Sequence, residues 1–197
     1  QGFNPRPRLM FASPLPVGAS GLGELVALDL ATDMPPETVV DALNGALPEG
    51  LRAFEAWRVP AGRGTFGTVI RSEWAVDLVF DASPEGGLLP ALEAALNGML
   101  EAQTFTTRRR DGRVKEIRRC ILGLSAGQVH GLEASLVMIL LQDGDLSARP
   151  QDVVQALCET VGPAVPVGMC RRSMTVDIGM AGRSPRAGGV KTGEEGR

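Results

Sequence analysis

The sequence is poor in the side chains that most often carry out chemistry. It has one histidine, three cysteines and no tyrosine among its 197 residues. Cys120, Cys158 and Cys170 lack the C-x-x-C spacing of zinc and iron–sulfur sites, and His130 alone provides no paired-histidine ligand set. No G-x-S-x-G elbow accompanies His130, while Cys120 and Cys158 stand among apolar residues and are expected to be small core residues. We therefore predict no catalytic residue set, no metal site and no cofactor.

Long apolar runs and a secretory leader are also missing from the sequence. The longest apolar stretch, residues 134–141, is interrupted by Ser135 and has the length of a strand. A membrane-spanning helix needs roughly 18 apolar residues. Gln1 is not followed by the charged-then-apolar pattern of a signal peptide. Three unevenly spaced cysteines form no disulfide framework, so we expect a cytoplasmic protein without a membrane partner.

One eight-residue pattern occurs twice. Pro-x-x-Val-Val-x-Ala-Leu at residues 36–43 recurs at residues 150–157, 114 positions later. Proline in the first turn and an apolar stripe at helical spacing predict a helix in each place. Strand-like runs precede and follow each predicted helix, at residues 24–30 and 51–59 and again at residues 132–141 and 169–178. The chain is therefore predicted to contain an internal repeat.

The second repeat has more elements in front of its shared pattern. Residues 74–80 predict a strand, residues 88–100 an amphipathic helix, and residues 104–124 a hairpin with Asp111-Gly112 at its tip. The resulting order is the βαββαβ plan of ferredoxin-like folds with one added strand. The first repeat begins only at a strand over residues 9–13. The expected fold class is α+β, with two tandem ferredoxin-like repeats, the first lacking its initial strand and helix.

This organisation predicts four segments. Residues 1–60 form the truncated first repeat, residues 61–71 a Gly-rich linker, residues 72–178 the second repeat, and residues 179–197 a disordered tail. The linker contains G-x-G-x-x-G at residues 62–67. A dinucleotide site would need a helix to begin at these glycines, whereas the residues that follow favour a strand. No H-R-D or D-F-G motif accompanies the pattern as in kinases, so an inter-repeat loop is the better interpretation.

A cluster of basic residues stands out in a chain whose net charge is −3. Seven of the twenty lysines and arginines fall between Arg108 and Arg119. A basic two-stranded ribbon can lie along a phosphate backbone, although charge can also simply discourage edge-to-edge strand pairing. The scarcity of aromatic residues disfavours base stacking. The candidates for RNA binding are Arg6, Arg8, Arg108, Arg109, Arg110, Arg113, Lys115, Arg118 and Arg119.

The start of the chain resembles a known family. Residues 1–9 (QGFNPRPRL), with Phe11-Ala12 and the Pro-Leu-Pro-Val-Gly of residues 14–18, are similar to the signature of a radical-SAM-linked bacterial domain of unknown function. Weaker similarity occurs at residues 114–117, 121–122 and 171–173, and Arg119-Cys120 departs from the family pattern of proline followed by an aromatic residue. The family-motif residues are Gly2, Phe3, Asn4, Pro5, Pro7, Pro14, Pro16 and Gly18.

The resemblance implies a bacterial protein that works with a radical SAM protein, fused or separate. In that family a strand and a helix with a Phe-Leu-Ser-His-Leu-Asp-like stretch precede the motif. We expect a non-catalytic accessory module of a radical SAM system that presents its basic hairpin to RNA. Two alternatives stay open: an enzyme whose active site spans the missing N-terminus and the Gln1–Gly18 segment, and a purely structural assembly domain.

Overall fold

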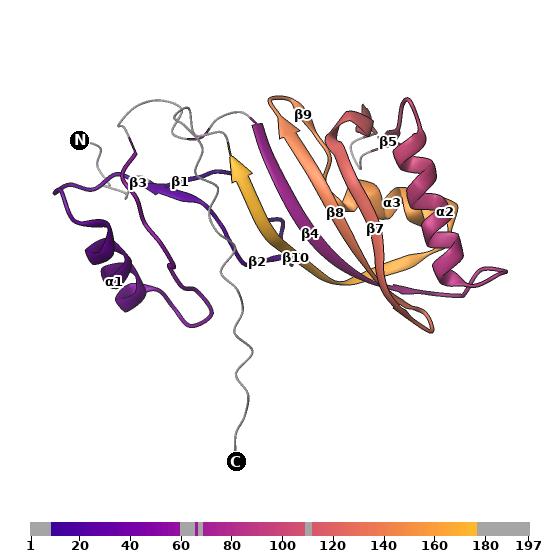
Figure 1. Cartoon of the computed structure of the whole chain (residues 1–197), viewed down its shortest axis with the longest axis horizontal. Helices are drawn as coiled ribbons and strands as arrows, with labels where there is room; N and C mark the ends of the chain where they lie inside the picture. Colours follow the sequence, from indigo (N-terminus) through magenta and orange to yellow (C-terminus); the bar gives the residue numbers. More distant parts are fainter. Residues whose placement is uncertain (1–8, 60–65, 67–68, 109–111, 177–197) are drawn as a thin grey trace, which may run out of the picture.

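The computed structural model describes residues 9–59, 66, 69–108 and 112–176. It is an α+β protein built on one large central sheet (Figure 1). Helix α1 (Pro36–Ala46) lies at one end of the molecule with strands β1 (Leu9–Phe11) and β3 (Val26–Leu28). Helices α2 (Leu88–Glu101) and α3 (Pro150–Thr160) lie at the other end. The described helices thus divide between two ends of the molecule.

Four long strands make the central sheet. They are ordered β10 (Ala164–Val176), β4 (Val69–Phe80), β8 (Glu133–Asp143) and β7 (Ile121–His130), and each neighbour is antiparallel to the next. Strand β2 (Ser20–Gly21) adds parallel to the outer edge of β10, and β9 (Leu146–Ser147) pairs with β8. From β4 onward the helices and the strands of the central sheet follow in the order β4, α2, β7, β8, α3 and β10, that is strand, helix, strand, strand, helix, strand. The tandem repeat stays a prediction.

The larger core lies between the central sheet and two helices. Successive side chains of a strand point to opposite faces, and alternate residues of β4 and β8, such as Val76 and Met138, are fully buried. They belong to one cluster with Leu92 of α2 and with Val153 and Leu157 of α3. Sheet residues at a period of two and helix residues at three-to-four spacing therefore meet in a single core.

Helix α3 is held at its start by a local hydrogen bond. Pro150 stands in its first turn, where a missing N–H costs nothing, and the Asp152 carboxylate accepts a hydrogen bond from the backbone N–H of Arg149 at 2.9 Å. Thr38 occupies the matching position of α1, which has no side-chain cap. The two copies of the repeated pattern both form helices, but only the second has this N-terminal bond.

The predicted strand over residues 51–59 is wrong. Those residues form no strand, because no strand of the described part of the chain lies beside them to pair with. The side-chain amide of Asn44 instead accepts from the N–H of Ala53 at 2.8 Å and donates to its carbonyl at 3.0 Å. Leu51 and Phe54 are 61% and 74% exposed. An extended segment without a neighbour thus takes its hydrogen bonds from a side chain.

The predicted hairpin over residues 104–124 is divided in the structure. Strands β5 (Thr106–Arg108) and β6 (Val114–Glu116) form a separate two-stranded sheet. A 3₁₀ turn at Arg118–Cys120 follows, and β7 then joins the central sheet. The division occurs because Ile117, Cys120 and Ile121 are buried, so the chain turns into the core after β6.

The remaining predictions concern the linker, the tail and membrane-spanning segments. Strand β4 begins at Val69, inside the predicted linker. The rest of the G-x-G-x-x-G loop, apart from Phe66, and the predicted tail at 179–197 lie outside the described residues. No helix in the described part of the chain is long and apolar enough to span a bilayer.

Candidate nucleic-acid interface

The basic hairpin is a short ribbon beside the central sheet. Strands β5 and β6 pair in register, with Thr106 opposite Glu116 and Arg108 opposite Val114. Gly112 has φ 79°, a left-handed conformation that suits glycine at a hairpin turn. The ladder continues one step inward, where the N–H of Ile117 donates to the carbonyl of Phe105 at 2.8 Å. The ribbon is therefore joined to a buried residue at its base.

Arg118 holds the base of the hairpin against α2. Its guanidinium donates to the carbonyl of Ala102 at 3.1 Å, to that of Ile121 at 2.9 Å, and to that of Leu100. Leu100 and Ala102 lie at the C-terminal end of α2, where helix carbonyls lack partners and the helix dipole is negative. Arg118 is half-buried, and its donors are directed at the protein itself. Its role in this structure is therefore to stabilise the fold, which sets it apart from the other RNA-binding candidates.

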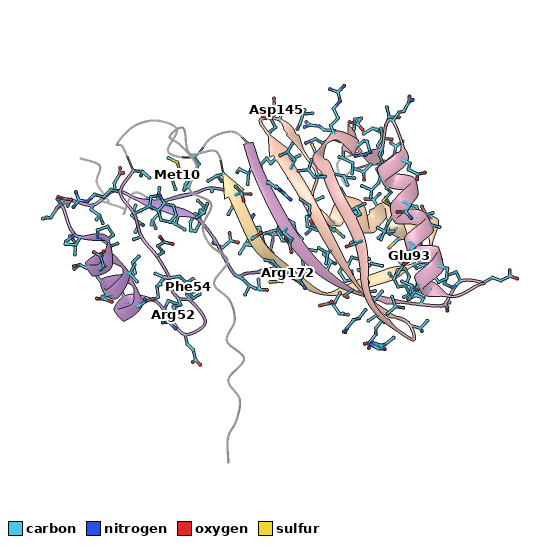
Figure 2. All side chains as sticks on the ribbon, viewed as in Figure 1. Met10, Arg52, Phe54, Glu93, Asp145 and Arg172 are labelled. Carbon is cyan, nitrogen blue, oxygen red and sulfur yellow. The ribbon has the colours of Figure 1, made fainter. Side chains whose placement is uncertain are left out.

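Lys115 connects the hairpin to the turn after β8. Its ammonium donates to the carbonyl of Asp145 at 2.8 Å and to the hydroxyl of Ser147 at 3.0 Å. Asp145, which is labelled in Figure 2, lies in the turn between β8 and β9. These two hydrogen bonds hold the ribbon in place. Because they use two of the three ammonium donors, Lys115 can bind an external anion less well than a cation without such bonds.

Glu116 organises the backbone at the same place. Its carboxylate accepts from the N–H of Phe105 at 2.9 Å and from the N–H of Arg118 at 2.8 Å. The Phe105 bond lowers the pKa of Glu116 most, burial opposes it, and the Arg118 bond and the charge of Arg119 lower it further. Glu116 thus remains ionised at neutral pH and offsets one of the positive charges around it.

Three of the candidate arginines remain exposed in the described part of the hairpin. They are Arg108 on β5, Arg113 before β6 and Arg119 in the 3₁₀ turn. Arg6, Arg8, Arg109 and Arg110 lie outside the described residues. The structure therefore separates the basic cluster into exposed cations and cations that stabilise its base, a distinction that charge counting could not make.

The nearby cysteine is unsuited to nucleophilic chemistry. Cys120 is 1% exposed, and burial raises the pKa of its thiol. A raised pKa keeps the sulfur protonated at neutral pH, whereas catalysis needs the thiolate. The expectation that Cys120 is a small core residue is confirmed, and Cys158 packs half-buried against the same core.

The structure contains a buried arginine that was not predicted from the sequence. It lies where residues 13–24 meet strand β10 of the central sheet. Arg171 of β10 is 2% exposed and pairs with Glu24, with its Nε donating to the carboxylate at 2.9 Å. It also donates to the carbonyl of Ser13 at 2.8 Å and lies 5.1 Å from the ring centre of Trp74. We call Arg171, Glu24, Ser13 and Trp74 the junction cluster. Arg171 between Cys170 and two polar residues gave no signal of burial in the sequence.

The junction cluster lies next to some of the family-motif residues. Strand β2, which follows Gly18, pairs with Cys170 and Arg171, and the N–H of Leu22 donates to the carbonyl of Arg171 at 2.9 Å. Pro14, Pro16 and Gly18 lie between Ser13 and β2 on this connection. Gly2, Phe3, Asn4, Pro5 and Pro7 lie outside the described residues. The described motif residues therefore occur where the first half of the chain meets the sheet.

A comparison with protein families gives a match over most of the chain. A family model described as an uncharacterized protein conserved in bacteria (DUF2344) matches residues 1–150. No curated protein matches the chain. The matched region contains both the basic hairpin and Ser13 and Glu24 of the junction cluster, and it ends at the first residue of α3.

Proposed function

We propose that this chain, which belongs to the bacterial family DUF2344, is a non-catalytic accessory module that binds an RNA backbone through its basic hairpin. The observation that carries the proposal is the exposure of three hairpin arginines. Arg118 and Lys115 fix the base of the ribbon, while Arg108, Arg113 and Arg119 remain exposed on it. Guanidinium groups bind phosphate oxygens through their paired N–H donors.

The mode of binding follows from what surrounds these arginines. Thr106 and Val114, the exposed neighbours on the ribbon, have no ring on which a base could stack. Phosphate contacts position a nucleic acid without reading its sequence. We therefore expect salt-sensitive binding with little sequence preference.

Filter binding of total tRNA and of an unstructured RNA at several salt concentrations tests this proposal. The triple variant R108A/R113A/R119A should lower affinity and reduce the slope of log affinity against log salt by about 2, since each single-strand phosphate contact contributes about 0.7. A matched triple variant, R52A/R71A/R172A, removes three exposed arginines elsewhere and should leave the slope unchanged. Equal losses in the two triple variants, or no binding by the wild-type chain, would refute RNA binding by the hairpin.

The proposed architecture is a tandem of two ferredoxin-like units. The order β10-β4-β8-β7 supports this for the second unit, because it places the fourth, first, third and second strands of a βαββαβ plan side by side. The 114-residue offset supports it for the first unit. It carries Leu9–Phe11 of β1 onto Gly123–Ser125 of β7, α1 onto α3, and residues 51–59 onto residues 165–173 of β10.

The first unit would then be completed by a strand and a helix of the β4–α2 kind, ahead of β1. In the plan, the last strand pairs only with the first strand of its unit, as β10 pairs with β4. The unpaired state of residues 51–59 fits a missing neighbour of this type. Hydrogen exchange tests the idea: residues 51–59 should become protected when a strand and a helix of the β4–α2 kind are fused ahead of β1, and unchanged exchange would count against it.

The proposed partner is a radical SAM protein, fused to this chain or separate from it. The support is the resemblance of residues 1–18 to the radical-SAM-linked signature. Co-purification of the tagged chain with a radical SAM protein encoded beside it, after nuclease treatment, should recover a complex that does not depend on RNA. If neither a fusion nor a nuclease-resistant complex is found, this part of the proposal fails while RNA binding by the hairpin can still hold.

A further inference from the structure

A further exposed arginine lies beside the base of the hairpin. Arg149, the residue before α3, forms no ion pair with a carboxylate of the described residues. The backbone N–H of Ala148 lies within reach of the Cys120 sulfur, and α3 contacts β5. Arg149 follows Ala148 and Arg119 precedes Cys120, so the fold brings these two exposed arginines to one corner from distant parts of the sequence. We call Arg119 and Arg149 the basal arginines.

Two other exposed arginines lie at the tip of the hairpin. Arg108 is the last residue of β5, and Arg113 precedes Val114, the residue opposite Arg108. We call Arg108 and Arg113 the tip arginines. A strand rises about 3.3 Å per residue, so the chain runs roughly 10 Å from Arg113 to Glu116 on its way to the basal arginines. The tip and basal arginines therefore occupy opposite ends of the ribbon.

Carboxylates lie between the tip and basal arginines. Glu116 of β6 is ionised, and the turn between β8 and β9 brings two exposed carboxylates, those of Asp143 and Asp145, to the same strand. The turn is held there because Lys115 donates to the carbonyl of Asp145 at 2.8 Å, and Asp143 lies within electrostatic reach of Cys120. Three negative charges thus face one ammonium, so phosphates are attracted at the two ends of the ribbon and repelled from its middle.

We infer that the ligand of this surface is double-stranded RNA, with one backbone on the tip arginines and the other on the basal arginines. A single strand that follows the ribbon from tip to base passes the carboxylates, whereas a duplex has two rows of phosphates with a groove between them. The minor groove of A-form RNA is wide and shallow and displays 2′-hydroxyls, whose O–H groups donate to carboxylates. Duplex bases are already stacked, so they need no aromatic ring from the ribbon. The inference names the ligand of the hairpin and therefore rests on the proposed function.

Three ligands test the inference: an RNA duplex of about 16 base pairs, one of its strands alone, and a DNA duplex of the same sequence. The wild-type chain should bind the RNA duplex at least about tenfold more tightly than the other two, since the single strand uses one end of the ribbon at a time and DNA has no 2′-hydroxyls. R149A should reduce the slope of log affinity against log salt by about 0.9 for the RNA duplex, the value for one contact to a double helix, and change it little for the single strand.

R149K keeps the charge and should keep the slope, and R52A, which removes an exposed arginine elsewhere, is the matched control. D145A should narrow the preference for RNA over DNA, because it removes an acceptor for 2′-hydroxyls and a charge that repels DNA. Equal affinity for the RNA duplex and either other ligand, or equal slopes for R149A and R52A, would overturn the inference. RNA binding by the hairpin would still stand if R108A/R113A/R119A weakened it. A chain that binds none of the three ligands would refute both.

Discussion

The two helices with the repeated pattern differ in what lies beneath them. Val153 and Leu157 of α3 are fully buried, whereas α1 has no buried residue although Val39 and Leu43 occupy the matching positions. Both helices have eleven residues and begin with proline. A local pattern thus determines that a helix forms and where it begins, while its burial depends on whether a sheet lies against its apolar stripe.

Residues 9–59 and the described residues that follow them also differ in how much apolar surface they expose. Of the seventeen exposed large apolar side chains in the described part of the chain, ten belong to residues 9–59. All three residues of β1, Leu9, Met10 and Phe11, are exposed, and an isolated two-stranded ribbon is only marginally stable. Figure 2 shows Met10, Arg52 and Phe54 at this end of the molecule, away from Asp145 and the hairpin. Packing interactions therefore stabilise the second half far more than the first.

The largest expected effect compares one residue with its repeat counterpart. Leu157→Ala should lower the free energy of unfolding by about 2–5 kcal/mol, because it leaves a cavity in the core. Leu43→Ala, the same change 114 residues earlier, should cost less than about 1 kcal/mol, since Leu43 is only half-buried. Urea unfolding followed by circular dichroism measures both values. Similar losses in the two variants would mean that α1 packs as α3 does.

A smaller effect should come from the connection between the halves. Glu24→Ala leaves the guanidinium of Arg171 buried without its carboxylate, and we expect a loss of about 2 kcal/mol, below the roughly 3–5 kcal/mol of a fully buried pair because Glu24 keeps some exposure. Glu73→Ala, which removes the exposed partner of Arg172, is the control and should change stability by about 0–1 kcal/mol. Hydrogen exchange should also increase at β2 in the first variant alone. If Glu24→Ala leaves both stability and β2 exchange unchanged, the junction cluster does not hold the halves together.

The sequence predicted elements well where the signal was local. The three described helices and the strands β1, β3, β4, β8 and β10 lie at or near their predicted positions, because periodicity and turn residues encode them directly. Residues 51–59 failed because a strand depends on a neighbour that no local pattern reveals. The structural roles of Arg118 and Arg171 were missed for a related reason, since carbonyls of α2 and the carboxylate of Glu24 meet them only after folding. Charge clustering located the hairpin but could not separate its exposed cations from its structural ones.

The smallest expected effect concerns the pH dependence of the hairpin base. The folded-state pKa of Glu116 lies below its ordinary value, so its ionised form contributes stability above the unfolded-state pKa, and this contribution is lost as pH falls through the folded-state pKa. Glu116→Gln cannot ionise and weakens the bonds to the N–H groups of Phe105 and Arg118 at neutral pH. The stability difference between wild type and Glu116→Gln, measured by thermal unfolding, should therefore shrink on acidification. A difference that stays constant across that range would mean that the charge of Glu116 does not stabilise the base of the ribbon, and Glu93→Gln on the exposed side of α2 gives the baseline for a carboxylate without such bonds.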